Sequence, residues 1–347
     1  MGKPVLLILS HSIEEHDQVE LLSSLGYDVF SLGGYIDPAH PHDPKRPAIP
    51  TAPRHPELQA VVDGLGQPDN IGAAARHVPA PILEWLGDDG IIIAHHYLEE
   101  RIYPQWTHLH DWKRGSSRRR IVRRTVGQSV SGNEWACKDF RGYGLEVVRY
   151  SPKERAIPGY AGEDALIRFW VDDVAYGGWT GEDAVVGNVT QHLVRRHPAT
   201  NAEFAARATS GLPIAFAGPG SEEGFDGIGE LSWDAMRDYL RRIRAYIYTG
   251  TQPASYTLGL LEAMMTGVPV VSIGPSWMTQ FPEGPAIFEG HELATTWSDD
   301  PEVARAHLRA LLEGDDLAAD ASRAIRARAV EIFGRERIGA QWREFLG

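Results

Sequence analysis

The feature that most constrains the fold is a regular alternation of short apolar runs with segments of helical spacing. The first half contains "PVLLILSHS", "GIIIAHH" and "GLEVVRYSP", and the second half contains "AVVGNVT", "AYIYTG" and "VPVVSIG". Continuous apolar runs of this length are typical of strands that are covered on both faces. Strands that alternate with helices indicate parallel sheets. The sequence therefore predicts an α/β fold with two doubly wound halves, joined by irregular chain around residues 151–182.

Length, charge and cysteine content narrow the class of protein. A chain of 347 residues is long for one domain, and its net charge of −13 repels nucleic acid and anionic membranes. The single cysteine, Cys137, excludes an internal disulfide and fits a reducing compartment. The apolar run Pro4–Leu9 is too short for a signal peptide or a spanning helix. We therefore expect a cytoplasmic protein, with a local basic patch wherever a polyanion would bind.

Several helices and one loop can be assigned from their end signals. Helical spacing ends at Gly26 in "HDQVELLSSLG", and Ser232 is an expected N-cap for "SWDAMRDYLRRI". "APILEWLG", "NAEFAARATSG" and the chain from Pro301 onward are also expected to be helical. Residues 37–54 are rich in proline, histidine and charge, which predicts a long irregular loop.

One apolar segment contains a single charged side chain. Glu262 is the only Asp, Glu, Lys or Arg between Arg244 and Glu283. We expect a helix that opens directly beyond a strand, near residues 251–257, with Pro253 in its first turn and Gly267 as its stop. Free N–H groups at such a helix start can hold phosphate, and Ser255 and Thr257 can add hydroxyl donors. The alternative is a structural helix in which Glu262 pairs with a buried arginine.

The stretch "ASYTLGLLEAMMTGVPVV" resembles the donor-site motif of family-four glycosyltransferases, in which a Glu precedes Gly-Phe-Gly-Leu and a second Glu precedes Ala-Met and Gly-x-Pro-Val. The resemblance implies the GT-B fold, with two Rossmann-like doubly wound domains facing a central cleft and a C-terminal helix that crosses back. The corresponding division is residues 1–165 for the acceptor side, 166–325 for the nucleotide-sugar donor side and 326–347 for the returning helix. The motif implies that Glu262 binds the ribose of the donor and that the amides of Tyr256, Thr257 and Leu258 hold its diphosphate. Ala254 stands in place of the first Glu, so Thr251 or Gln252 would contact the transferred sugar.

Weaker similarities extend the implied donor site. "AFAGPG", with Gly218, resembles the glycine turn before the base pocket, and "IGELS" places Glu230 and Leu231 beside the nucleobase. Arg196, with Arg195 as the alternate, would neutralise the diphosphate leaving group. The alternative for these two arginines is an ordinary surface pair. The resemblance implies retaining transfer from a UDP- or GDP-linked sugar as co-substrate, with no metal or other cofactor.

The exits of the first-half strands supply the candidate acceptor residues, because strand ends surround the ligand site in such folds. These candidates are His11, Ser12, Gly33, Gly34, His95, His96, Gln128 and Ser129. The resemblance assigns a contact with the donor sugar to His96, with His95 as the alternate; the alternative for each is a solvated loop residue. The pair His108 and His110 lacks further zinc-ligand spacing. Glu14, Glu15 and Asp17 are candidate acceptor binders; the favoured alternative is that they face solvent in a first helical turn.

A basic cluster lies in the segment "KRGSSRRRIVRR". Arg118 and Arg120 are candidate contacts for a polyanionic acceptor such as DNA or an anionic lipid head group. The alternative is a solvated strand edge whose arginine stems pack on the sheet. The stretches "LSHS", "LGYDVFSLGGYIDP", "RRTVGQS", "VRYSPKE", "LIRFWVD" and "SYTLGLLEAMMTG" together resemble a glycosyltransferase group common in phage and bacterial genomes. This resemblance implies a hydroxymethylated base of phage DNA as one acceptor and the host cytoplasm as the location. A surface glycan or lipid-linked sugar is the alternative acceptor, and a sugar-nucleotide binder, hydrolase or epimerase is the alternative activity.

Overall fold

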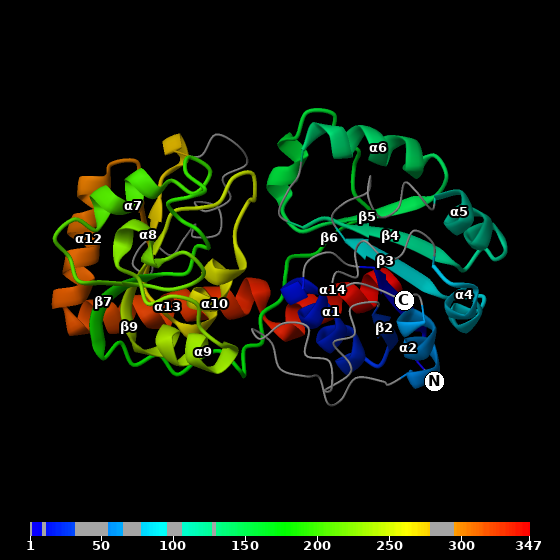
Figure 1. Ribbon diagram of the computed structural model, residues 1–347, viewed down its shortest axis with the longest axis horizontal. Coiled ribbons are helices and arrows are strands. Elements are labelled where there is room, and N and C mark those ends of the chain that lie inside the picture. The colour runs from blue at the N-terminus through cyan, green and yellow to red at the C-terminus, as the bar shows by residue number, and fades with distance from the viewer. Residues whose placement is uncertain are drawn as a thin grey trace. The chain divides into compact units, whose positions relative to one another are not determined.

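A computed structural model describes residues 2–8, 12–31, 55–64, 78–95, 106–126, 130–277 and 295–347. The chain forms two compact units (Figure 1). Unit 1 comprises Met1–Phe169 and Gly339–Gly347, and unit 2 comprises Trp170–Ile338. The first unit thus ends four residues later than the expected 165, and residues 326–338 belong to unit 2 rather than to the returning segment.

Unit 1 is built on a parallel sheet in the order β2-β1-β3-β4-β5-β6. Its strands are β1 (Pro4–Ile8), β2 (Asp28–Ser31), β3 (Ile91–His95), β4 (Arg120–Arg124), β5 (Leu145–Arg149) and β6 (Ala165–Leu166). The apolar runs are buried as expected, because helices cover both faces of the sheet. In Figure 1, α6 lies on one side of β3, β4 and β5, and α1 and α14 lie on the other.

The helices of unit 1 are α1 (Ser12–Ser24), α2 (Pro56–Asp63), α4 (Ala80–Leu86), α5 (Trp106–Arg114) and α6 (Ser131–Arg141), and a 3-10 helix, η3, spans Pro152–Ala156. The predictions of α1, its stop at Gly26 and α4 are confirmed. The sequence did not indicate α5 and α6, because their apolar positions are few: α5 buries only Leu109 and Trp112, and α6 buries Cys137 and Phe140 among polar residues.

Unit 2 is built on a second parallel sheet in the order β11-β10-β9-β7-β8. Its strands are β7 (Asp183–Asn188), β8 (Ile214–Phe216), β9 (Ile243–Tyr248), β10 (Val270–Ile273) and β11 (Thr295–Ser298). Its helices are α7 (Ala202–Ala208), α8 (Glu222–Phe225), α9 (Trp233–Arg242), α10 (Leu258–Thr266), η4 (Pro275–Trp277), α12 (Pro301–Glu313) and α13 (Asp315–Phe333). The expected strand and helix alternation of the second half is therefore confirmed, including the Ser232 cap, whose hydroxyl accepts the Ala235 N–H at 3.4 Å.

The last helix, α14 (Arg335–Leu346), completes unit 1. Trp342 is only 1% exposed, and the Lys3 ammonium donates to the Leu346 carbonyl at 2.8 Å. The Arg120 guanidinium lies 4.5 Å from the Phe345 ring centroid and donates to the Phe345 carbonyl at 2.7 Å. The end of the chain is therefore packed and hydrogen-bonded into unit 1, against the first and fourth strands.

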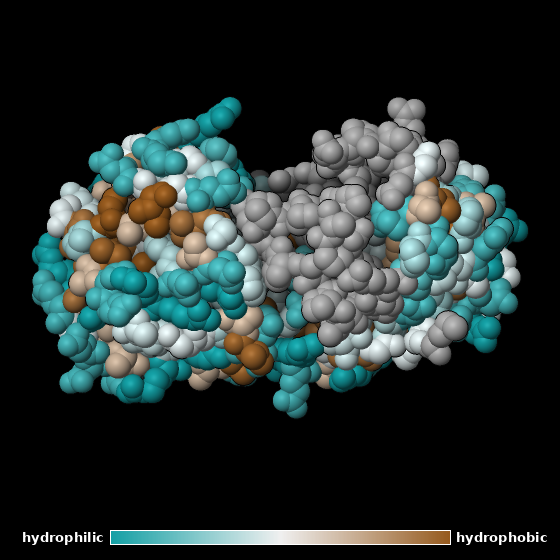
Figure 2. Space-filling view, turned by 60° about the horizontal axis from the view of Figure 1, so that its bottom comes forward, coloured by the Kyte–Doolittle hydropathy of each residue, from teal (hydrophilic) through white to brown (hydrophobic). Residues whose placement is uncertain are grey.

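Two features concern contact with membranes: the hydropathy of the surface, and the length and apolar character of the helices. On the face shown in Figure 2, hydrophilic residues cover most of unit 2, and apolar residues form smaller areas between them. Across the ranges that the structure describes, no helix combines the length and the apolar character needed to cross a bilayer.

Candidate functional site

The connection from β9 into α10 forms a helix start at the carboxyl end of the unit 2 sheet. Thr257 is the N-cap of α10, and its hydroxyl accepts the Leu260 N–H at 3.4 Å. Pro253 therefore lies in the loop before the helix and not in its first turn, so that prediction was wrong. The N–H groups of Leu258 and Gly259 lie in the first turn, where the helix offers no carbonyl partner. The stop at Gly267 is confirmed, because this residue ends the helix with a φ of +97°.

This helix start sits where the winding of the sheet reverses. The chain passes from β7 to β8 on one side and from β9 to β10 on the other, and β7 and β9 are neighbours. The connections after β7 and β9 therefore leave the sheet in opposite directions. Ligands of open parallel sheets bind at the carboxyl ends of strands at such a point.

The two connections also contact each other closely. The Gln252 N–H donates to the Ala199 carbonyl at 2.7 Å, which ties the β9–α10 loop to the loop after β7. A methyl group added at Gly259 would lie 2.3 Å from Cγ2 of Val189. Glycine thus allows the first turn of α10 to approach the backbone at the exit of β7.

Glu262 lies one turn further along α10 and is only 7% exposed. Its Oε1 accepts a hydrogen bond from the Tyr176 hydroxyl at 2.8 Å. Burial raises the pKa of Tyr246 on the adjacent strand, and the charge of Glu262 adds to that rise. The alternative from the sequence was a pairing with a buried arginine; one partner in the structure is the Tyr176 phenol, which orients the carboxylate.

Tyr176 is held in place by Arg326 of α13. The Arg326 guanidinium donates to the Tyr176 carbonyl at 2.8 Å, to the Asp173 carbonyl at 2.7 Å and to the Met265 carbonyl. It therefore joins the turn that carries Tyr176 to the C-terminal end of α10. Tyr176 carries no signal in the sequence, because it lies 86 residues from Glu262 and no local pattern connects the two.

The other donor-side candidates lie on connections at the same edge of unit 2. Gly218 follows β8 with a φ of +103°, and its N–H donates to the Gly229 carbonyl at 2.7 Å. Glu230 is exposed and Leu231 is half-buried in the chain that leads from this turn to α9. Arg195 and Arg196 are both exposed in the connection after β7.

The remaining donor-side candidates differ in exposure. Ser255 and Tyr256 are 1% exposed, and the Tyr256 ring packs on Phe333 with centroids 5.7 Å apart. Thr251, Thr257 and Leu258 are half-buried. Thr257 and Leu258 at the helix start are therefore more exposed than Tyr256.

Most of the acceptor-side candidates cannot be placed. His11, Gly33, Gly34, His96, Gln128 and Ser129 lie outside the described residues, as does the expected loop 37–54. Ser12 begins α1 and His95 ends β3, but the positions of their side chains are likewise outside the description.

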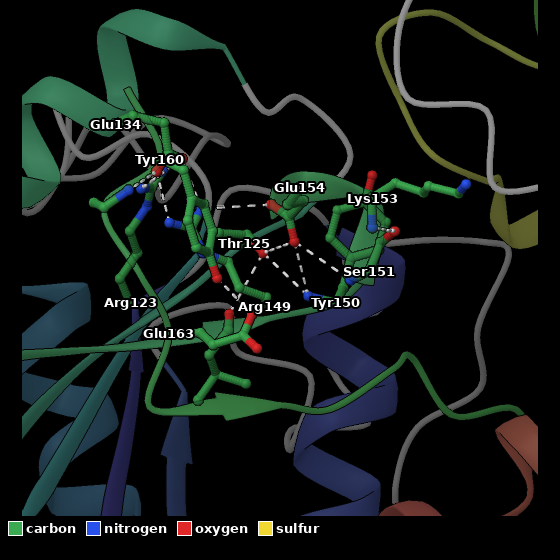
Figure 3. A network of polar contacts seen from close by, with 12 residues as sticks. Arg123, Thr125, Glu134, Arg149, Tyr150, Ser151, Lys153, Glu154, Tyr160 and Glu163 are labelled. Atoms are coloured by element: carbon green, nitrogen blue, oxygen red, sulfur yellow. Dashed lines mark hydrogen bonds and ion pairs between the residues drawn. The ribbon is translucent and has the colours of Figure 1, made fainter. Parts of the chain in front are cut away.

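The carboxyl edge of the unit 1 sheet contains a buried network of charged groups (Figure 3). Nη1 and Nη2 of Arg149 donate to Oε1 and Oε2 of Glu134, each at 2.6 Å, and the Ala161 N–H donates to Oε2 at 2.8 Å. Burial opposes ionisation of Glu134, but the bonds from Arg149 outweigh it and hold the pKa of this carboxyl below its ordinary value. Glu154 accepts the Thr125 hydroxyl at 2.8 Å and the Tyr150 N–H at 3.1 Å. The network fixes the ends of β4 and β5.

Two expectations for unit 1 change with the structure. Glu14 and Glu15 are 2% and 4% exposed, so the prediction that they face solvent was wrong. Oε1 of Glu14 lies 3.8 Å from Nε of Arg124, which is fully buried on the adjacent strand. Tertiary pairing with a strand arginine has replaced solvation at the first turn of α1.

The basic segment 113–124 is largely engaged inside unit 1. Arg119 donates to the carbonyls of Gly87 and Trp112, each at 2.7 Å, and Arg120 pairs with Glu146. Arg123 and Arg124 are buried, whereas Arg114 and Arg118 are exposed. The segment is thus closer to the packed strand edge that was the alternative than to a continuous basic surface.

Comparison with known proteins places the fold. No protein-family model matches the chain, and no curated protein matches it in sequence. Among solved structures, a glycosyltransferase from Rickettsia africae ESF-5 is 10% identical over 99% of this chain and 97% of that chain, with a TM-score of 0.66. HepE of Anabaena, solved with UDP and glucose, is 13% identical over 100% of this chain and 99% of that chain, with a TM-score of 0.61.

TarM of S. aureus is also similar, at 13% identity and a TM-score of 0.59. The match covers 80% of this chain and 58% of TarM, so the chain spans somewhat over half of that protein's length. These likenesses show the fold, two parallel α/β units as in GT-B glycosyltransferases. Within the described ranges, no group of three or more His, Cys, Asp and Glu side chains is arranged to hold a metal ion.

Proposed function

We propose that the protein is a glycosyltransferase that moves a sugar from a nucleotide-diphosphate sugar to a hydroxyl group of an acceptor. The observation that carries this proposal is the position of Glu262, a buried carboxylate on α10 at the reversal point of the unit 2 sheet. The GT-B fold supports it, and HepE, which shares that fold, was solved with UDP and glucose.

The diphosphate of the donor would bind at the start of α10. The positive end of the helix dipole and the first-turn N–H groups of Leu258 and Gly259 suit an anion. Between Arg244 and Glu283 the sequence has one acidic residue, Glu262, so no second carboxylate of this segment repels a phosphate. Arg196 or Arg195, exposed on the neighbouring connection, would supply the positive charge that a leaving diphosphate requires.

Glu262 would accept hydrogen bonds from the ribose hydroxyls of the donor. Tyr176 donates to its Oε1, and a carboxylate has about four lone-pair sites, so it can accept from further donors. The phenol therefore acts as a positioning group that holds the carboxylate in one orientation. We propose UDP or GDP as the nucleotide and no metal cofactor.

Retention at the anomeric carbon and the identity of the acceptor are part of the proposal. In a retaining reaction of this kind, the departing donor phosphate accepts the acceptor proton, and no protein nucleophile is needed. His96 or His95 would contact the donor sugar. Ala254 removes the carboxylate with which related motifs contact the sugar, so Thr251 or Gln252 would take that role.

Two kinds of acceptor are proposed: a hydroxymethylated base of phage DNA, and a surface glycan or lipid-linked sugar. The structure gives less support to DNA. Of the basic segment, only Arg114 and Arg118 are exposed arginines, and Arg120 is bound to Glu146 and to α14. A surface glycan or a lipid-linked sugar needs no such patch. Charge reversal of Arg114 and Arg118 separates these acceptors, because it lowers transfer to DNA and leaves transfer to a glycan unchanged.

The donor site is tested by calorimetric titration with UDP and GDP and with the 2′,3′-dideoxy form of whichever nucleotide binds. The wild-type protein should bind the ribose form about 10- to 100-fold more tightly than the dideoxy form, since a hydrogen bond to a charged group contributes about 1.5–3 kcal/mol net of the bonds to water that it replaces.

Glu262→Gln should lose most of that preference and remain folded, and Tyr176→Phe should weaken it by a smaller factor. Equal preference for the ribose form in wild type and Glu262→Gln would assign Glu262 a structural role instead. Hydrolysis of the nucleotide sugar without transfer to any acceptor would favour the hydrolase that Ala254 leaves as the alternative.

A further inference from the structure

Arg123 is a buried arginine whose hydrogen-bonding groups are incompletely used. It lies near the carboxyl end of β4 and is 2% exposed. Within the part of the chain that the structure describes, its Nε and Nη1 have no hydrogen-bond partner. Among the described residues, the acidic atom nearest to Nη1 is Oε1 of Glu134 at 3.9 Å, which is too long for a hydrogen bond.

The neighbouring arginine of the same network differs sharply. Arg149 donates to both oxygens of Glu134 at 2.6 Å and to the Gly162 carbonyl at 3.0 Å. Arg149 and the Ala161 N–H hold Glu134 in a position that leaves Nη1 of Arg123 3.9 Å from Oε1, beyond hydrogen-bond distance. Figure 3 shows Arg123 and Arg149 on the same side of the network as Glu134. Of these two arginines, Arg149 hydrogen-bonds the carboxylate, whereas Arg123 makes one long ion-pair contact with it.

Buried donors without acceptors are costly and are uncommon in folded proteins. An oxyanion would satisfy them, because the planar guanidinium fork matches the oxygens of phosphate and carboxylate groups. The location fits a ligand as well, since ligands of parallel sheets bind beyond the carboxyl ends of the strands.

The start of α6 adds a second favourable feature beside Arg123. Glu134, the residue 3.9 Å from Arg123, is in the first turn of this eleven-residue helix. The N-cap position is Val130, whose side chain caps no N–H group. The positive end of the helix is therefore not offset by a capping side chain. Arg149 neutralises Glu134, so this carboxylate repels an incoming anion less than a free one would.

We propose that Arg123 binds an oxyanion, a phosphate or carboxylate group, and that the acceptor of the transferase carries this group. The second half rests on the proposed function, whereas the binding of an oxyanion at Arg123 does not. The acceptor would then be an anionic molecule that unit 1 binds through the buried guanidinium of Arg123.

The first test is thermal unfolding with inorganic phosphate at constant ionic strength, with and without excess UDP to occupy the proposed donor site. Wild-type protein should be stabilised by phosphate in both series, because a ligand that binds only the folded state raises its melting temperature. Arg123→Met should bind phosphate at least tenfold more weakly than the wild type. Lys138→Gln, at an exposed cation in the last turn of α6, removes the same charge and should leave phosphate affinity unchanged.

The stability of the variants separates a ligand-binding arginine from a structural one. Without phosphate, Arg123→Met should melt at or above the wild-type temperature, because it removes unmet buried donors. Arg123→Lys should fold and retain partial phosphate affinity. A large fall in the melting temperature of Arg123→Met, or equal phosphate affinity in wild type and Arg123→Met, would overturn the inference.

The second test distinguishes the two oxyanions and the role in transfer. Glucose, glucuronate and glucose 6-phosphate differ at one carbon and are compared by calorimetry as probes. Preference for glucuronate or for glucose 6-phosphate over glucose in the wild type, lost in Arg123→Met, identifies the group. Equal binding of all three by both proteins would contradict an oxyanion site. If the wild-type protein binds neither UDP nor GDP but still binds phosphate at Arg123, the donor proposal is refuted and the oxyanion site stands.

Discussion

The carboxyl edges of the two parallel sheets differ in how many buried charged side chains they contain. In unit 1 the described buried residues at or near this edge include the arginines Arg123, Arg124 and Arg149 and the glutamates Glu14, Glu134 and Glu154. In unit 2 Glu262 is the single buried Asp, Glu, Lys or Arg among the described residues. One edge is self-neutralised by ion pairs, and the other is nearly neutral and offers backbone N–H groups and hydroxyls.

This difference indicates how each edge would treat a ligand. A neutral edge with a helix start suits a doubly charged diphosphate, which brings its own charge and needs donors. A self-neutralised edge binds an additional charge only where its internal pairing is incomplete. Arg123 is a position in unit 1 where buried guanidinium donors have no hydrogen-bond partner among the described residues.

The largest expected effect breaks the pairing in unit 1. Arg149→Met leaves Glu134 buried without the two hydrogen bonds that Arg149 donates and should lower the free energy of unfolding by about 3–5 kcal/mol. Urea denaturation followed by circular dichroism measures this loss. Arg155→Gln, at the exposed rim of the network, is the control and should cost far less. Equal losses for both variants would mean that the buried network contributes no more than a surface pair.

A smaller effect is expected where unit 2 relies on close packing rather than on charge. Gly259→Ala would place a methyl group 2.3 Å from Val189 Cγ2 and should cost about 1–3 kcal/mol. It should also weaken nucleotide binding, because the first turn of α10 must shift. The double variant Gly259→Ala/Val189→Ala should recover much of both losses, which a double-mutant cycle measures. Simple additivity of the two substitutions would show that these residues do not meet.

The smallest expected effect is on the pH dependence of stability, through Glu163 of the unit 1 network. Burial opposes ionisation of Glu163, but hydrogen bonds from Arg155 and Tyr160 lower its pKa below the ordinary 4.5. A lowered folded-state pKa stabilises the protein above the unfolded value and loses that contribution as pH falls through the folded value.

Glu163→Gln should therefore be less stable than wild type at pH 7, by under about 1 kcal/mol for a partly exposed pair. The two proteins should converge below pH 4.5. Unfolding titrations between pH 7 and pH 3 measure the difference, and a constant difference across this range would exclude the Glu163 charge as its source.

The sequence by itself determined the α/β class, the order of most strands and helices, and the helix start that precedes Glu262. These features are local: apolar runs specify buried strands, and Ser232 and Gly267 mark helix ends through their own backbone geometry. Short polar helices such as α5 and α6 carry too little apolar pattern to be found this way.

Only the tertiary structure decided which charged groups are paired. Tyr176 reaches Glu262 across 86 residues, and Arg124 reaches the Ile167 carbonyl across 43. Likewise, Glu14 and Glu15 sit in a helix turn that favours solvated acids, yet both are buried. A side chain's charge is visible in the sequence, but its solvation and its partner depend on which distant strand or helix the fold brings beside it.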